Sequence, residues 1–184
     1  RCVGNCTYCS YTPEYAKDTE ADTRTACKIV DEIYDFGSPW FGISGGEPLI
    51  REDIFDVIGY AKQMGFEVSL ITSGFAFSEK SFNNLVRNEV HTAVSVDGTQ
   101  ESNDLIRGRG SYDKALFAIK KLSEAGILDC IVTTMTKNNI KDSEHPVKLA
   151  EEYGARMVVF HNLVPVGRAG SNMIDLSPSP EEYE

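Results

Sequence analysis

The chain has 184 residues, of which 41% are hydrophobic, so it can bury a core and we expect one domain over residues 1–184. Its 18 basic and 28 acidic residues give a net charge of −10 with no run of lysine or arginine, which argues against a nucleic-acid partner. No apolar stretch approaches the roughly 18 residues needed to span a bilayer, and the first residues do not resemble a signal peptide. We therefore expect a cytoplasmic protein without a membrane partner.

Three of the five cysteines, Cys2, Cys6 and Cys9, lie within eight residues at the start of the chain. Clustered cysteines indicate metal or redox chemistry rather than disulfides. Thiolates suit both zinc and iron–sulfur clusters, and three of them leave one coordination position unclaimed, as in catalytic sites. A closed zinc site needs a fourth ligand, whereas Cys27 and Cys130 stand alone in a predicted helix and at the start of a predicted strand. We expect these two to be small core residues.

Helical and strand patterns alternate after the cysteines. Apolar stripes predict helices over 22–34, around Ile54 to Ala61, after an N-cap at Ser78, after Ser111, and over 146–153. Strands are predicted over 40–44, 68–72, 92–96, 131–135 and 157–160. This alternation predicts an α/β fold in which right-handed crossovers make the sheet parallel. The carboxyl ends of the strands then share one rim, where polar residues can converge.

Several short segments follow the predicted strands and are candidates for that rim. They are Gly45-Gly46-Glu47-Pro48, Thr72-Ser73-Gly74, Ser95-Val96-Asp97-Gly98, Thr133-Thr134 and His161 to Val164. The paired glycines let the backbone approach a ligand closely, and the Glu47 carboxylate can accept hydrogen bonds from an ammonium group. Ordinary turns that satisfy backbone groups are the alternative for each segment.

The Cys-x3-Cys-x2-Cys spacing, with Tyr8 just before the third cysteine, and the Gly-Gly-Glu-Pro segment together resemble the radical SAM superfamily. The resemblance extends from Cys2 to about Gly170. It implies a partial (β/α)6 TIM-like barrel with parallel strands, whose first strand would precede Arg1 and is missing from this chain. The domain is accordingly expected to be a core truncated at both ends, without a C-terminal auxiliary region carrying further cysteines.

The resemblance also assigns roles to residues. Cys2, Cys6 and Cys9 would bind a 4Fe-4S cluster, and the segment around Glu47 would contact the amino end of S-adenosylmethionine. Ser95 would approach the ribose or methionine part, and Arg107, in a run resembling Arg-Gly-x-Gly-Ser-Tyr, would bind the carboxylate. The expected cofactor-binding set is Tyr8, Gly45, Gly46, Glu47, Ser73, Ser95, Asp97, Arg107 and Val164. Ser73 stands where relatives commonly have asparagine, so it lacks the amide donors.

The implied reaction is reductive cleavage of S-adenosylmethionine to a 5'-deoxyadenosyl radical, which abstracts hydrogen from the substrate. An electron donor such as ferredoxin or flavodoxin would be the partner. Residues 165–169, Pro-Val-Gly-Arg-Ala, resemble a stretch of enzymes acting on siroheme-derived haems and of SPASM-type peptide-maturing relatives. A tetrapyrrole and a ribosomal peptide therefore both stay open as substrates. A non-catalytic iron–sulfur electron-transfer module and a zinc-bound interaction domain are the alternatives, and both leave the paired glycines unexplained.

Overall fold

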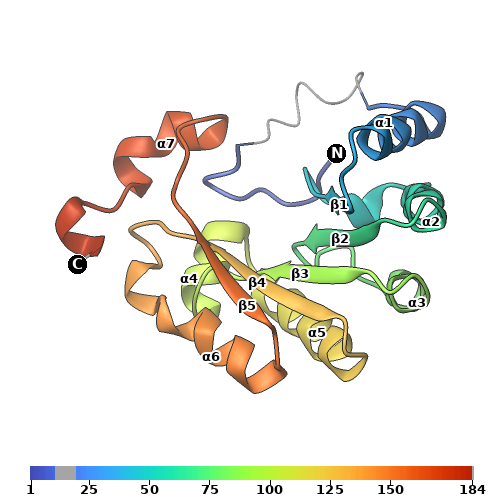
Figure 1. Cartoon of the computed structure of the whole chain (residues 1–184). Coiled ribbons are helices and arrows are strands. Elements are labelled where there is room, and N and C mark those ends of the chain that lie inside the picture. Colours follow the sequence, from blue (N-terminus) through green and yellow to red (C-terminus); the bar gives the residue numbers. More distant parts are fainter. Residues whose placement is uncertain (11–19, 184) are drawn as a thin grey trace.

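A computed structural model of the chain describes residues 1–10 and 20–183 and contains one five-stranded sheet (Figure 1). The strands are β1 (Trp40–Ile43), β2 (Glu67–Thr72), β3 (His91–Ser95), β4 (Leu128–Thr134) and β5 (Met157–His161). They lie side by side in chain order, and each neighbouring pair is parallel. The predicted parallel α/β sheet is confirmed, with strand boundaries that differ from the prediction by a few residues.

Most of the helices form a layer against one face of the sheet, whereas the last α-helix lies apart from that layer, beside the N-terminal segment (Figure 1). The α-helices are α1 (Thr23–Asp35), α2 (Ile54–Gln63), α3 (Glu79–Arg87), α4 (Gln100–Arg107), α5 (Ser111–Glu124), α6 (Glu144–Tyr153) and α7 (Arg168–Leu176). Short 3-10 helices are η2 (Pro48–Ile50), η3 (Ile140–Asp142) and η4 (Pro180–Tyr183). Ser78 caps α3 as predicted, because its hydroxyl accepts a hydrogen bond from the Ser81 amide. Among these helices none is long and apolar enough to cross a membrane.

The two faces of the sheet differ in the residues they carry. Leu70 on β2, Val94 on β3 and Ile131 on β4 are fully buried against the helices. Smaller residues, among them Ala93 and Cys130, pack together on the other face. The alternation of a strand separates these two sets, so one face makes the core and the other stays available for a site. Cys130 is buried as predicted.

The two sheet edges are β1 and β5. Within residues 1–10 and 20–183, β1 pairs with β2 alone. An earlier strand beside β1, which the family resemblance implies, stays a prediction.

The turn between α4 and α5 differs from the sequence expectation. We expected Ser111 to cap the following helix, but Ser111 is the first residue of α5, and Gly110 is its N-cap. The cap comes instead from Asp104 on α4, whose carboxylate accepts hydrogen bonds from the amides of Gly110 (2.7 Å) and Tyr112 (2.9 Å). A carboxylate can replace the usual capping residue because it satisfies the same unpaired amides.

The packing of the core predicts a large effect of truncating Leu70. Leu70→Ala is expected to lower the free energy of unfolding by about 2–5 kcal/mol, because the site is fully buried and leaves a cavity. Urea denaturation followed by circular dichroism measures the change. Leu105→Ala is the matched control, since Leu105 is 63% exposed. Equal losses in the two variants would contradict the described core.

The Asp104 cap predicts a pH-dependent contribution to stability. Burial favours the neutral carboxyl, but hydrogen bonds from Tyr112, Gly110 and Ser111 outweigh it and hold the pKa of Asp104 below its ordinary value. The stabilisation is therefore present above the unfolded-state pKa of about 4 and is lost as the pH falls through the lower folded-state value. Asp104→Asn should be about 1 kcal/mol less stable than the unchanged chain at neutral pH.

That gap should narrow when urea denaturation is repeated at about pH 3. Asp35→Asn, at an exposed position at the end of α1, serves as the control and should show no such convergence. A gap for Asp104→Asn that stays constant with pH would be the contrary result.

Candidate active site

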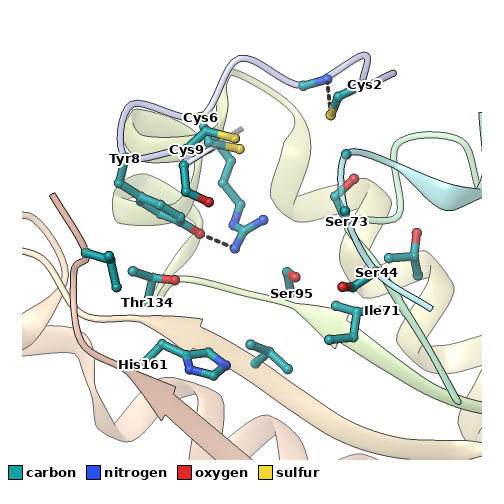
Figure 2. Close-up of a pocket in the computed structure, with 18 of the residues that line it drawn as sticks. Cys2, Cys6, Tyr8, Cys9, Ser44, Ile71, Ser73, Ser95, Thr134 and His161 are labelled. Atoms are coloured by element: carbon teal, nitrogen blue, oxygen red, sulfur yellow. Dashed lines mark hydrogen bonds between the residues drawn. The ribbon is translucent and has the colours of Figure 1, made fainter. Parts of the chain in front are cut away.

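A cavity of about 300 Å³ lies at the carboxyl ends of the strands, beneath the N-terminal cysteine segment (residues 1–10). Figure 2 shows Cys6, Tyr8 and Cys9 on one side of it, Ser73 on the opposite side, and Ser95 between them. Of the residues predicted to contact metal or cofactor, those that line the cavity are Cys2, Cys6, Tyr8, Cys9, Gly45, Gly46, Ser73, Ser95, Arg107 and Val164. Glu47 and Asp97 lie close to it without lining it.

The cysteine segment has no regular secondary structure and is held at separate points along its length. The carbonyl oxygen of Arg1 accepts a hydrogen bond from the Glu47 amide (3.0 Å), and the Thr7 amide donates to the Ile106 carbonyl oxygen (3.0 Å). A Cβ at Gly46 would lie 2.1 Å from the Arg1 oxygen. Gly46 therefore permits a close approach, and the approaching group in this structure is the cysteine segment itself.

The three sulfurs are spread around the cavity mouth. Figure 2 shows the Cys6 and Cys9 sulfurs side by side and Cys2 apart from them, where its Sγ accepts a hydrogen bond from the Gly4 amide (3.3 Å). Within the described residues they do not converge as ligands of a single ion. Zinc requires such convergence, whereas a 4Fe-4S cluster takes each thiolate at a different iron. Soft donors spread around an open cavity fit a cluster.

The Cys6 thiol also lies in a shielded environment. Burial raises its pKa, while the positive charge of Arg107 acts in the opposite direction.

The Glu47 carboxylate is buried and accepts hydrogen bonds from neighbouring residues of the protein. Its Oε1 accepts hydrogen bonds from Thr72 Oγ1 (2.8 Å) and the Leu49 amide (3.3 Å), and its Oε2 accepts from the amide (2.9 Å) and hydroxyl of Ser73. Glu47 is 2% exposed, so it ties the loop after β1 to the loop after β2. A contact between Glu47 and a ligand ammonium group stays a prediction. The backbone of Gly45 and Gly46 faces the cavity.

Asp97 likewise forms buried contacts rather than lining the cavity. Its Oδ2 accepts hydrogen bonds from the Tyr8 hydroxyl (2.7 Å) and Arg107 Nε (2.6 Å), and its Oδ1 accepts from the Thr134 amide (2.8 Å). Arg107 also donates to the Tyr8 hydroxyl. Asp97 is fully buried and Arg107 is 7% exposed, so this is a desolvated ion pair that reaches the cysteine segment through Tyr8.

Burial and neighbouring charges set the protonation states of Tyr8 and Arg107. Burial raises the pKa of Tyr8 well above its ordinary value, against the effect of Arg107, so the phenol stays neutral. Burial alone would lower the pKa of Arg107, but the charge of Asp97 outweighs it and the pKa is raised. Arg107 therefore presents a permanent positive charge in the cavity wall. Its contact with a cofactor carboxylate stays a prediction.

Some lining residues were not singled out from the sequence. Ser44, Ile71 and Val132 line the cavity, and strand alternation could have found the last two, because they share a sheet face with Ser95. Alternation also separates the threonines at the end of β4. Thr134 lines the cavity, whereas the Thr133 hydroxyl donates to a buried carbonyl oxygen.

Comparison with known families decides the classification. Residues 1–153 match the profile of the Radical SAM superfamily. This chain belongs to the radical SAM superfamily. Radical SAM proteins use a 4Fe-4S cluster and S-adenosylmethionine.

Two curated relatives align with nearly the whole length of this radical SAM chain. "Fe-coproporphyrin III synthase" of Methanosarcina barkeri is 31% identical over 99% of this chain and 46% of its own length. "Mycofactocin maturase MftC" of Mycolicibacterium smegmatis is 31% identical over 96% of this chain and 46% of its own length. This chain thus spans about half the length of these relatives.

A solved structure shares the fold. Streptococcus suis SuiB bound to precursor peptide SuiA superposes with a TM-score of 0.79 at 18% identity, covering 89% of this chain and 37% of SuiB.

Removing one charge of the buried ion pair between Asp97 and Arg107 should strongly lower the stability of the fold. Asp97→Asn should lower the free energy of unfolding by about 3 kcal/mol or more, because Arg107 is left buried without a counter-charge. Urea denaturation measures the loss. The double variant Asp97→Asn with Arg107→Met should recover part of it, since no isolated charge remains. A loss no larger than that of Asp175→Asn, at an exposed position on α7, would contradict the described pair.

Proposed function

We propose that this chain is the catalytic core of a radical SAM enzyme that binds a 4Fe-4S cluster through Cys2, Cys6 and Cys9. S-adenosylmethionine would bind in the adjoining cavity. One observation carries the proposal: the three cysteines, the paired glycines and the carboxyl ends of the strands line the same cavity. A zinc-bound interaction domain gives no role to that shared cavity, and the sulfurs are not gathered around one point.

Reduction of the bound cluster would supply the electron that cleaves S-adenosylmethionine to methionine and a 5'-deoxyadenosyl radical. The protein's own groups bind, orient and exclude water. Backbone groups of Gly45 and Gly46, which line the cavity, would meet the amino acid end of the cofactor, and Arg107 would supply a fixed positive charge for its carboxylate. Ser95 and Val164 offer a polar and an apolar contact for the rest of the cofactor.

We infer hydrogen abstraction from a tetrapyrrole or a ribosomal peptide as the reaction class. Support comes from the names of the two curated relatives, which refer to a coproporphyrin and to a maturase. A ferredoxin or flavodoxin would donate the electron. A copurifying pigment with a porphyrin absorption spectrum would favour the tetrapyrrole, whereas a precursor peptide that stimulates turnover would favour the peptide.

Loss of any one cysteine of the set should abolish reductive cleavage. After anaerobic reconstitution with iron and sulfide, Cys2→Ala, Cys6→Ala and Cys9→Ala are each expected to form no dithionite-dependent 5'-deoxyadenosine, because each thiolate holds one iron. Chromatography of the reaction mixture measures the product. Cys27→Ala, which removes a half-buried thiol on α1, is the matched control and should keep the activity.

Three results would count against the proposal. Cleavage that survives a change at Cys2, Cys6 or Cys9 would remove the ligand assignment. A cluster that forms without any cleavage would indicate an electron-transfer module. Zinc without inorganic sulfide in anaerobically prepared protein would indicate the structural alternative.

A further inference from the structure

The turn after β5 contacts the cysteine segment, although the two are far apart in the sequence. The Arg168 amide donates to the Cys9 carbonyl oxygen (2.9 Å), and Asn172 Nδ2 donates to the Thr7 carbonyl oxygen (3.1 Å). The Arg168 guanidinium donates to Asn5 Oδ1 (2.5 Å). The N-terminal half of α7 therefore satisfies backbone acceptors on both sides of Tyr8.

Gly167, just before α7, lies close to the backbone at the end of the cysteine segment. Its φ is +61°, and a Cβ there would lie 2.5 Å from the Ser10 carbonyl oxygen and 2.8 Å from that of Cys9. These are backbone atoms, so a side chain could be accommodated only by moving the cysteine segment. Gly154 at the end of α6 offers a contrast, because its φ is +69° and no atom lies within 4 Å of its Cβ position.

An apolar contact accompanies these hydrogen bonds. Tyr8 packs against a small cluster formed by Leu163, Ala169 and Leu176, which belong to the turn after β5 and to α7. The start of the segment has a different support, since Arg1 is bonded to Glu47 in the loop after β1. The Cys6 to Cys9 half and the Cys2 end are thus held by different elements.

We propose that Gly167, Arg168 and Asn172 form a clasp that positions Cys6 and Cys9 for cluster binding; the inference rests on the proposed function. Ligands of a metal centre depend on the groups that orient them, and a segment without regular structure has few of its own. The turn that leads to Gly167 lines the cavity through Leu163 and Val164. This turn and the adjoining α7 thereby support both the cofactor cavity and the half of the segment that carries two ligands.

A test on the metal-free chain does not require the cluster. Gly167→Ala and Gly154→Ala share the backbone strain of a left-handed residue, but only the first places a methyl group against the cysteine segment. Iodoacetamide labelling resolved by mass spectrometry is expected to show several-fold faster reaction of Cys6 and Cys9 in Gly167→Ala alone. Cys2 should change little, and the buried Cys130 reports whether the core remains folded.

A second test uses the reconstituted chain. Gly167→Ala is expected to lose iron to a chelator about tenfold faster than the unchanged chain, the size of effect typical for groups that orient metal ligands. Gly154→Ala should lose iron at the unchanged rate. Asn172→Asp removes the donor to the Thr7 carbonyl oxygen without adding bulk. It should also speed the labelling of Cys6 and Cys9 and the loss of iron. If Gly167→Ala exposes Cys130, Asn172→Asp takes its place in both measurements.

The outcomes separate the two proposals. If the unchanged chain takes up no iron and sulfide, the proposed function fails, and labelling still decides whether the clasp restrains the segment. If Gly167→Ala and Asn172→Asp match Gly154→Ala in both measurements, the clasp is overturned. Faster labelling without faster iron loss would also overturn it, because the contact would then have no bearing on the cluster.

Discussion

The site depends on the buried ion pair between Asp97 and Arg107. Asp97 follows β3, Arg107 ends α4, and their shared partner Tyr8 lies between the second and third cysteines of the site. The amide of Thr134 at the end of β4 completes the set. The Asp97 carboxylate is shielded from water and needs hydrogen bonds from all of these donors. The elements that supply the donors are therefore fixed relative to one another. An irregular segment thereby acquires a defined position over the ends of the strands.

On the other side of the cavity, the buried Glu47 carboxylate likewise joins separate elements. Its two oxygens are bonded to the loop that follows β2, and its own amide holds Arg1. Glu47 and Asp97, both expected from the sequence to contact the cofactor, each join separate elements through hydrogen bonds. The cavity wall contains glycine backbone, small hydroxyl residues, one arginine and the thiols, together with apolar side chains such as Ile71 and Val132. Such a wall suits a ligand that brings its own reactive chemistry and requires mainly orientation and shielding.

Much of the fold was predictable because short apolar strands alternate with helices along the chain, and most of these helices carry apolar stripes. Two helices were missed for different reasons. The first five residues of α4, Gln-Glu-Ser-Asn-Asp, include no apolar residue, and its buried face contains Ser102 and Asn103, whose burial depends on partners elsewhere. The α7 helix contains Gly170, and glycine disfavours a helix. Helices of this kind are stabilised by tertiary contacts rather than by local preference.

The sequence by itself determined the donor chemistry and the order of elements: three thiolates at a short spacing, paired glycines after a strand, and alternating helices and strands. Parallel strands place their carboxyl ends at one rim, and this explains why most of the predicted residues meet in one cavity. The tertiary structure alone decided which polar groups face that cavity and which lie behind it. A buried carboxylate turns toward whichever donors neighbouring elements provide, and spacing along the chain carries no information about donors that are distant in sequence.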